Sequence, residues 1–325
     1  MSGEHFLTFA GSFPLENTRE NMLRCLEDIF SIPINYPNYV QLEDMNRQFL
    51  DPLSNLDIGL ARDGDRYIHI DDLREPESPI AVEPLSQLIE FIEERNLGDK
   101  VGGVRACVTG PFTLSSRIEK EGLGGKIFGR AILSDIELVS QTARLVAKIA
   151  YFYQERGATL INIDEPILSV IIGKHFFFKG YTESNVIEIL NETIGRVGTL
   201  KGIHVCGRLS PRLREILLQT EFNVLDHEFY DIRENLDVYT RRELDRSDKR
   251  ISFGSVSSKN TRVEPEDEIK AFLQEGIETF GSENILFFKP DCGFRGLFDP
   301  GLSHEEVYRI TIQKLRNLKR AIDRL

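Results

Sequence analysis

The hydrophobic residues of this chain gather in short runs, and longer amphipathic segments separate them. Each run is almost continuous in apolar residues, which is typical of parallel strands buried on both faces. Runs that alternate with helical segments predict a (β/α)8 TIM barrel comprising residues 1–325 as a single domain, with an open doubly wound sheet as the alternative. The eight runs are residues 7–12, 38–45, 104–110, 159–166, 202–207, 223–229, 250–256 and 284–293.

Capping residues indicate where several of the amphipathic segments begin. Asn17 is followed three residues later by Glu20, and this spacing predicts a capping box at the first helix. Pro265 suits a helix start, and Ser303 with Glu306 opens the last helix. These signals support helices between the predicted strands and after the last one.

Two segments interrupt the alternation of strands and helices and are predicted to be insertions. Residues 62–72 contain an Asp-Gly pair, which predicts a β-hairpin after the second strand. Residues 116–129 form a charged, glycine-rich connection that could act as a lid.

Composition and charge exclude several classes of partner. The chain has 325 residues, a formal net charge of −12 and an isoelectric point near 5.2. Lysine and arginine are interleaved with acidic residues, so we expect no nucleic-acid partner. The sequence opens without a basic segment and a long apolar run, and apolar stretches such as residues 285–288 are too short to span a bilayer. We therefore expect a cytoplasmic protein with no membrane partner.

The four cysteines are too few for a disulfide scaffold, so each is a core residue, a metal ligand or a nucleophile. Cys107 lies inside an apolar run and Cys25 in an amphipathic segment, and both are predicted to be core residues. Cys206 and Cys292 instead lie at the ends of predicted strands.

Side chains that bind metals gather at three predicted strand ends. His204 and Cys206 lie on the same side of one strand, because side chains alternate along a strand. Glu228 ends the next strand and Cys292 follows the last one, and in a barrel all these ends meet at one face. Two thiolates, an imidazole and a carboxylate form a set that zinc accepts. A hydrogen-bonded histidine beside buried cysteines is the alternative, and the adjacent His227 could replace Glu228.

Three further residues could bind a small substrate at the same face. Ser12 ends the first run, where its hydroxyl and free backbone N–H groups could hold a carboxylate. Asp164 and Glu165 end the fourth run, and adjacent residues on a strand face opposite ways, so one of the two should enter the barrel mouth. That carboxylate could bind an ammonium group or pair with a neighbouring arginine.

Taken in order, these motifs resemble the catalytic domain of cobalamin-independent methionine synthase. They are GSFP at residues 11–14, IDEP at 163–166, the His-x-Cys pair, a glutamate 22 residues after that cysteine, and PDCG at 290–293. The resemblance covers nearly the whole chain. The same barrel superfamily includes uroporphyrinogen decarboxylase and the zinc-dependent coenzyme M methyltransferases.

The resemblance implies a zinc ion bound by His204, Cys206, Glu228 and Cys292, and methyl transfer to a thiol, with homocysteine as the leading acceptor. It also implies that Ser12 helps to hold the carboxylate of the amino acid and that Asp164 holds its ammonium group.

The sequence departs from the family pattern in ways that bear on the methyl donor and the acceptor. Family members that use methyltetrahydrofolate have a second barrel and a tryptophan that packs on the folate, whereas this sequence contains no tryptophan. Tyr39 stands where the family has an acidic residue that assists in binding the ammonium group. These absences resemble short, archaeal-type homologues, so we expect a methylcorrinoid donor (methylcobalamin) and a corrinoid protein as partner.

Other functions stay open at this point. One alternative is a related enzyme, such as a coenzyme M methyltransferase or a uroporphyrinogen decarboxylase-like enzyme. Another is a non-catalytic zinc protein that is an accessory to a corrinoid protein. A structural zinc site is usually closed and rich in cysteine, whereas a site with a carboxylate ligand opens more easily.

Overall fold

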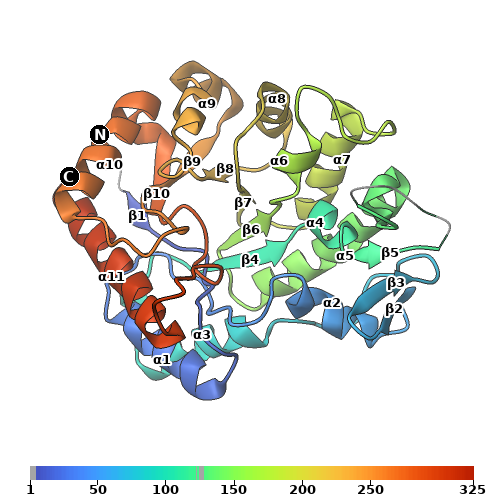
Figure 1. Ribbon diagram of the computed structural model, residues 1–325, viewed down its shortest axis with the longest axis horizontal. Coiled ribbons are helices and arrows are strands. Elements are labelled where there is room, and N and C mark those ends of the chain that lie inside the picture. Colours follow the sequence, from blue (N-terminus) through green and yellow to red (C-terminus); the bar gives the residue numbers. More distant parts are fainter. Residues whose placement is uncertain (1–4, 122, 124–127) are drawn as a thin grey trace.

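A parallel sheet of seven strands forms the centre of the computed structural model, which describes residues 5–121, 123 and 128–325. Figure 1 shows the strands inside a ring of helices. All neighbours in the sheet pair in parallel, as the buried apolar runs predict. In sheet order the strands are β1 (Phe6–Leu7), β10 (Ile285–Lys289), β9 (Arg250–Gly254), β8 (Val224–His227), β7 (Leu200–Val205), β6 (Leu160–Asp164) and β4 (Arg105–Thr109).

The second predicted strand is not a regular strand, and this part of the prediction was wrong. The chain there runs between the two edge strands and joins them by single bridges. Tyr36 donates its N–H to the carbonyl of Leu7 at 3.1 Å, and Arg105 donates to the carbonyl of Pro37 at 2.9 Å. Further parallel bridges join Asn38 to β4 and Gln41 to the segment after β1. Pro37 has no N–H to give to a ladder, which is one reason for the irregular pairing.

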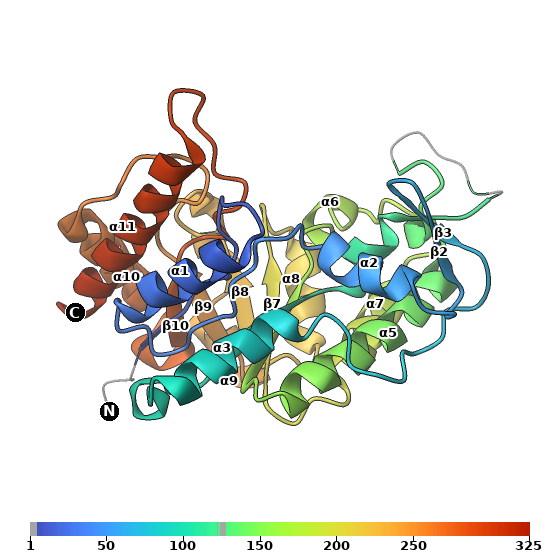
Figure 2. The ribbon, with the colours of Figure 1, turned by 90° about the horizontal axis from the view of Figure 1, so that it is seen from below.

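Helices follow most strands and cover the outside of the sheet. Figure 2 shows α1 and α3 along one side of it. Within the described residues, no helix is long and apolar enough to cross a membrane. The α-helices are α1 (Arg19–Phe30), α2 (Arg47–Ser54), α3 (Glu83–Glu94), α4 (Pro111–Ser115), α5 (Ile136–Glu155), α6 (Leu168–Ile171), α7 (Glu183–Ile194), α8 (Pro211–Gln219), α9 (Arg241–Ser247), α10 (Glu266–Phe280) and α11 (His304–Ile322). Short 3-10 turns are η1 (Gly98–Lys100), η2 (Ile132–Ser134), η3 (Arg233–Asp237) and η4 (Ser282–Asn284).

The first helix begins one residue later than its predicted cap. Thr18, and not Asn17, has extended backbone angles and accepts the N–H of Asn21 at 3.2 Å. A hydroxyl on an extended residue satisfies one of the free N–H groups of the first turn, so Thr18 takes the capping position.

The starts of the last two helices are confirmed. Pro265 precedes α10, which ends at Gly281 with a φ of 86°, a conformation that favours glycine. At α11, Ser303 and Glu306 form the complete capping box.

A second, smaller sheet lies to one side of the central one (Figure 1). Its strands β2 (Leu60–Asp63) and β3 (Arg66–His69) pair antiparallel around the predicted Asp-Gly turn, and β5 (Ile118–Glu119) pairs with β3 in parallel. β2 follows α2 rather than a regular second strand. The predicted lid begins with β5, but residues 122 and 124–127 within it lie outside the described residues.

A buried ion pair fastens the last helix to the loop that follows β9. Lys314 and Glu264 are at most 1% exposed, and the lysine Nζ lies 2.9 and 2.8 Å from the two carboxylate oxygens. Glu264 Oε1 also accepts the N–H of Ser257 at 3.1 Å. The pair therefore anchors this loop at Ser257 and Glu264, just beyond the carboxyl end of β9.

Replacing Lys314 by methionine is expected to lower the free energy of unfolding by about 3–5 kcal/mol, because the Glu264 carboxylate would stay buried without a counter-charge. Denaturant unfolding followed by circular dichroism measures this change. The control is Arg320→Met on the same helix, whose pair with Glu266 is exposed and is expected to contribute about 1 kcal/mol or less. Equal losses in the two variants would contradict the assigned role.

Candidate metal and thiol site

Three metal-binding side chains meet at the carboxyl end of the sheet. His204 lies in β7, Cys206 directly follows that strand, and Cys292 lies in the loop after β10. One donor atom from each residue lies within 4.8 Å of the others. His204 Nε2 is 2.9 Å from the Sγ of Cys206, and the two sulfur atoms are 3.4 Å apart. The predicted convergence of these three residues is present in the structure.

The buried carboxylate of Asp226 orients the His204 imidazole. Its Nδ1 lies 2.6 Å from Oδ1 of Asp226, which leaves Nε2 directed at the thiol. Lys289 Nζ lies 2.8 Å from the same carboxylate oxygen, and Arg105 forms an ion pair with the other oxygen at 2.7 Å, without hydrogen-bond geometry. Burial alone would raise the pKa of Asp226, but Lys289, Arg105 and His204 together hold it well below its usual range.

Sequence reasoning did not identify this Asp226 network. Its members lie on β4, β7, β8 and β10, so no local spacing connects them. The one available signal in the sequence was the presence of charged residues within strands that are otherwise apolar. Asp226 is adjacent to His204 in the β7–β8 ladder.

The two sulfur atoms of the site differ in acidity. A hydrogen bond from Cys206 and the nearby charge of His204 lower the pKa of the Cys292 thiol well below its usual value. The same hydrogen bond, together with burial, raises the pKa of Cys206. Two thiols and an imidazole with converging donor atoms form the donor set that zinc prefers, so the residues fit this metal.

His227 ends β8 and Glu228 directly follows it, so alternation along the chain places their side chains on opposite sides. His227 is packed against Tyr239, with its Nε2 3.1 Å from the tyrosine hydroxyl, and burial lowers its pKa to about 3. Glu228 shares an open cleft with Cys292, and its Oε2 lies 2.6 Å from Lys259 Nζ. Of the two adjacent residues, Glu228 is therefore the one beside the cluster.

The cleft beside the cluster has a volume of about 610 Å³ and is large enough for a small molecule. Ser12 lies on its wall close to the backbone of Gly293, where a Cβ atom would lie only 1.9 Å from the serine Oγ. Glycine at this position leaves room for the Ser12 hydroxyl in the conformation observed. The lining residues are Ser12, Gln41, Asp44, Met45, Glu228, Ser258, Lys259, Cys292, Gly293, Arg295 and Gly296.

The adjacent carboxylates Asp164 and Glu165 have different surroundings. Glu165 is fully buried and accepts the N–H groups of Phe112 and Thr113 at 2.8 and 2.9 Å, so it caps α4. Asp164 is partly exposed and is adjacent to His204 in the β6–β7 ladder. Its carboxylate accepts the side-chain N–H of Asn162 at 2.7 Å. Of the two, Asp164 is on the side of the cluster.

Tyr39 does not offer its hydroxyl to the cleft. The side chain is fully buried, and its hydroxyl donates to the carbonyl of Cys107 at 2.6 Å. Gln48 donates to the same hydroxyl at 3.0 Å. The hydroxyl therefore both donates and accepts a hydrogen bond within the protein interior.

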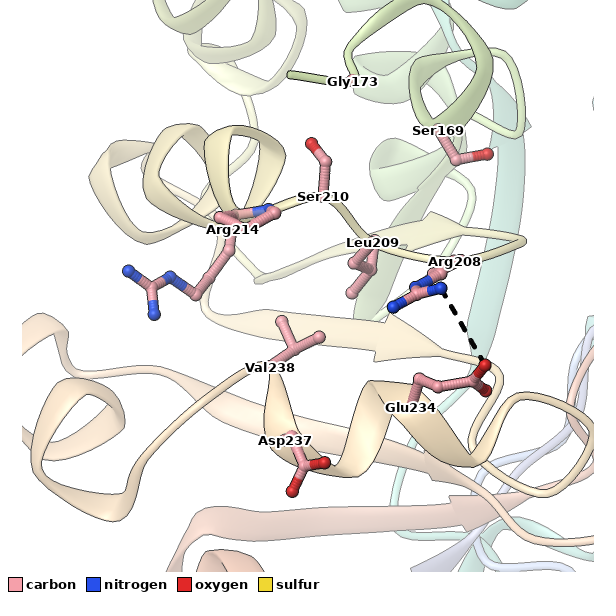
Figure 3. A pocket seen from close by; sticks show the side chains of 10 residues that line it. Ser169, Gly173, Arg208, Leu209, Ser210, Arg214, Glu234, Asp237 and Val238 are labelled. Carbon is pink, nitrogen blue, oxygen red and sulfur yellow. Dashed lines mark ion pairs between the residues drawn. The ribbon is translucent and has the colours of Figure 1, made fainter.

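A second cavity, of about 470 Å³, lies near the start of α8 (Figure 3). Arg208 and Glu234 face each other across it at 4.0 Å, and Arg214 pairs with Glu243 at 3.3 Å. Its lining includes none of the three converging residues, whereas Cys292 lines the first cleft.

Comparison with known proteins shows the family. A profile described as the catalytic domain of cobalamin-independent synthase matches residues 101–308. The chain belongs to this family. A methionine synthase of Methanothermobacter marburgensis is 30% identical over 224 residues, covering 69% of this chain and 63% of that protein. The methionine synthase of Methanothermobacter thermautotrophicus is 28% identical over 298 residues, covering 91% of this chain and 88% of that protein.

Solved structures agree on the fold. A B12-independent methionine synthase from Shewanella in complex with selenomethionine is similar, with a TM-score of 0.69 and 15% identity, over 98% of this chain and 97% of that one. The family is cobalamin-independent by its description, which conflicts with the predicted methylcobalamin donor and corrinoid partner. The lack of a tryptophan in this sequence was an insufficient ground for that prediction.

Replacing Cys206 or Cys292 by serine is expected to remove bound zinc, because a neutral hydroxyl is a much weaker zinc ligand than a thiolate. Elemental analysis of purified protein, with circular dichroism to check folding, measures this loss. The matched control is Cys25→Ser in α1, which lies among buried apolar residues and should keep the wild-type metal content. Full zinc retention in both site variants would overturn the ligand assignment.

Proposed function

We propose that the protein is a zinc-dependent methyltransferase that moves a methyl group to the thiol of homocysteine and so forms methionine. The observation that carries this proposal is the convergence of His204, Cys206 and Cys292 within 4.8 Å beside an open cleft. Membership of the cobalamin-independent synthase family supports it. The segment that bridges β1 and β4 also supports a closed eight-membered barrel, whose carboxyl face is the usual location of an active site.

His204, Cys206 and Cys292 would hold the metal, and Glu228 would be its fourth ligand before the acceptor binds. Zinc lowers the pKa of a bound thiol, and the thiolate is the nucleophile in methyl transfer. Asp226 keeps the imidazole oriented with Nε2 toward the cluster. The remaining residues of the cleft then have to place the substrate sulfur beside Cys292.

The amino-acid end of the acceptor requires an anionic contact for its ammonium group and a hydrogen-bond donor for its carboxylate. Asp164, beside His204 in the sheet, would bind the ammonium group, and Ser12 on the cleft wall would bind the carboxylate. Glu165 is already used to cap α4 and is left out of this role.

Methylation of a sulfonate thiol such as coenzyme M is a second candidate. Two cationic side chains, Lys259 and Arg295, line the cleft and would attract a sulfonate. Asp164 would repel it, so the two thiols are expected to differ in affinity.

Calorimetric titration of the zinc-loaded protein tests the proposed function. L-Homocysteine is expected to bind, whereas L-homoserine, which has a hydroxyl in place of the thiol, is not. Removal of zinc should abolish homocysteine binding while the protein stays folded. Equal binding of homocysteine and homoserine, or binding that does not depend on zinc, would overturn the proposal. Tighter binding of 2-mercaptoethanesulfonate than of homocysteine would favour the second candidate.

Replacing Asp164 by asparagine is expected to weaken homocysteine binding about tenfold to a hundredfold, because it removes a charged hydrogen bond of about 1.5–3 kcal/mol. The matched ligand is 4-mercaptobutanoate, which lacks the ammonium group and should bind the variant and the wild type about equally. The same loss of affinity for both ligands would contradict the assigned contact.

A further inference from the structure

Among the residues that the structure describes, Lys259 forms an ion pair with the Glu228 side chain. Glu228 is almost completely buried, at 3% side-chain exposure, while Lys259 is 53% exposed and reaches it from the cleft. The ion pair measures 2.6 Å. A buried carboxylate requires a counter-charge or hydrogen-bond donors, and here the lysine supplies both.

The loop that presents Lys259 is held in a fixed conformation. The Lys259 N–H is donated to Ser257 Oγ at 3.1 Å, and that hydroxyl donates to Asp231 at 2.9 Å. The Ser257 N–H is donated to Glu264, a member of the buried ion pair with Lys314. A long side chain on a fixed backbone can hold its partner at a defined place, which a mobile surface lysine cannot do.

The cluster and the ion pair meet at the same cleft. Cys292 and Glu228 both line it, and the three converging donor atoms come from His204, Cys206 and Cys292 without Glu228. Two groups could therefore supply the fourth ligand of a metal bound there, the Glu228 carboxylate and the sulfur of an incoming acceptor.

We propose that Lys259 is a positioning residue that holds Glu228 against the cleft wall and so leaves the fourth position to the acceptor thiol. This inference rests on the proposed function. Lys259 keeps its ion pair with the Glu228 carboxylate while the acceptor sulfur occupies the fourth ligand position. The proton of the thiol goes to solvent. Without the Lys259 ammonium group, Glu228 would lose its ion-pair partner and would stay at the cluster.

Zinc-edge X-ray absorption on the zinc-loaded protein, with and without homocysteine, tests this role. In the wild type, homocysteine is expected to raise the number of sulfur ligands from two to three. In Lys259→Met the zinc should be retained, the sulfur count should stay at two, and the dissociation constant should rise about tenfold or more. Lys259→Arg keeps the positive charge and should restore the third sulfur.

Two controls separate this role from general effects. Arg262→Met removes one positive charge from the same loop, where Arg262 pairs with the surface residue Glu268, and should behave as the wild type. In Glu228→Ala, adding Lys259→Met should cause no further loss, because the lysine acts through the carboxylate. If Lys259→Met gains a third sulfur ligand and binds homocysteine as tightly as the wild type, the role of Lys259 is overturned and the proposed function is not. No sulfur uptake in the wild type would overturn the proposed function as well.

Discussion

The ion pairs of the buried Asp226 carboxylate are the interactions on which the interior of the parallel sheet depends. Arg105 and Lys289 are each 1% exposed, and Asp226 is fully buried between them. Charges in such a place are tolerated only when they are paired, since an isolated buried charge costs several kcal/mol (about 3–5). The same carboxylate contacts His204, so one side chain both balances the core charges and orients the imidazole of the candidate metal site.

This arrangement connects four strands that are far apart in the sequence. The carboxyl ends of parallel strands meet at one face, so residues 86 positions apart, Cys206 and Cys292, come within 3.4 Å of each other. Sequence reasoning predicted that meeting from two short motifs and from the topology. It also predicted that one carboxylate of the Asp164 and Glu165 pair would face the site, because alternation along a strand is a purely local rule.

The rest depended on contacts that are not local. Glu165 is excluded from the cleft by the N–H groups of α4, a helix that begins more than fifty residues earlier in the chain. Lys259 meets Glu228 from a loop that is anchored by the buried pair of Glu264 and Lys314. The second strand is irregular partly because Pro37 has no N–H to donate. The first helix cap is Thr18 instead of Asn17 because Thr18 has the extended backbone angles of a capping residue. The methyl donor was inferred from absent residues, and the family assignment contradicted that inference.

Proton release on thiol binding tests the proposed chemistry most directly. A free thiol, with a pKa of about 8.5, is protonated at pH 7, and the site is proposed to bind the thiolate. Calorimetric titration of the zinc-loaded protein with homocysteine at pH 7, in buffers of different ionisation enthalpy, gives the number of protons released. We expect about one proton released per bound molecule, because the thiol is proposed to bind as the thiolate and its proton goes to solvent. Binding without proton release would show that the thiol enters unactivated and would contradict the proposed mechanism.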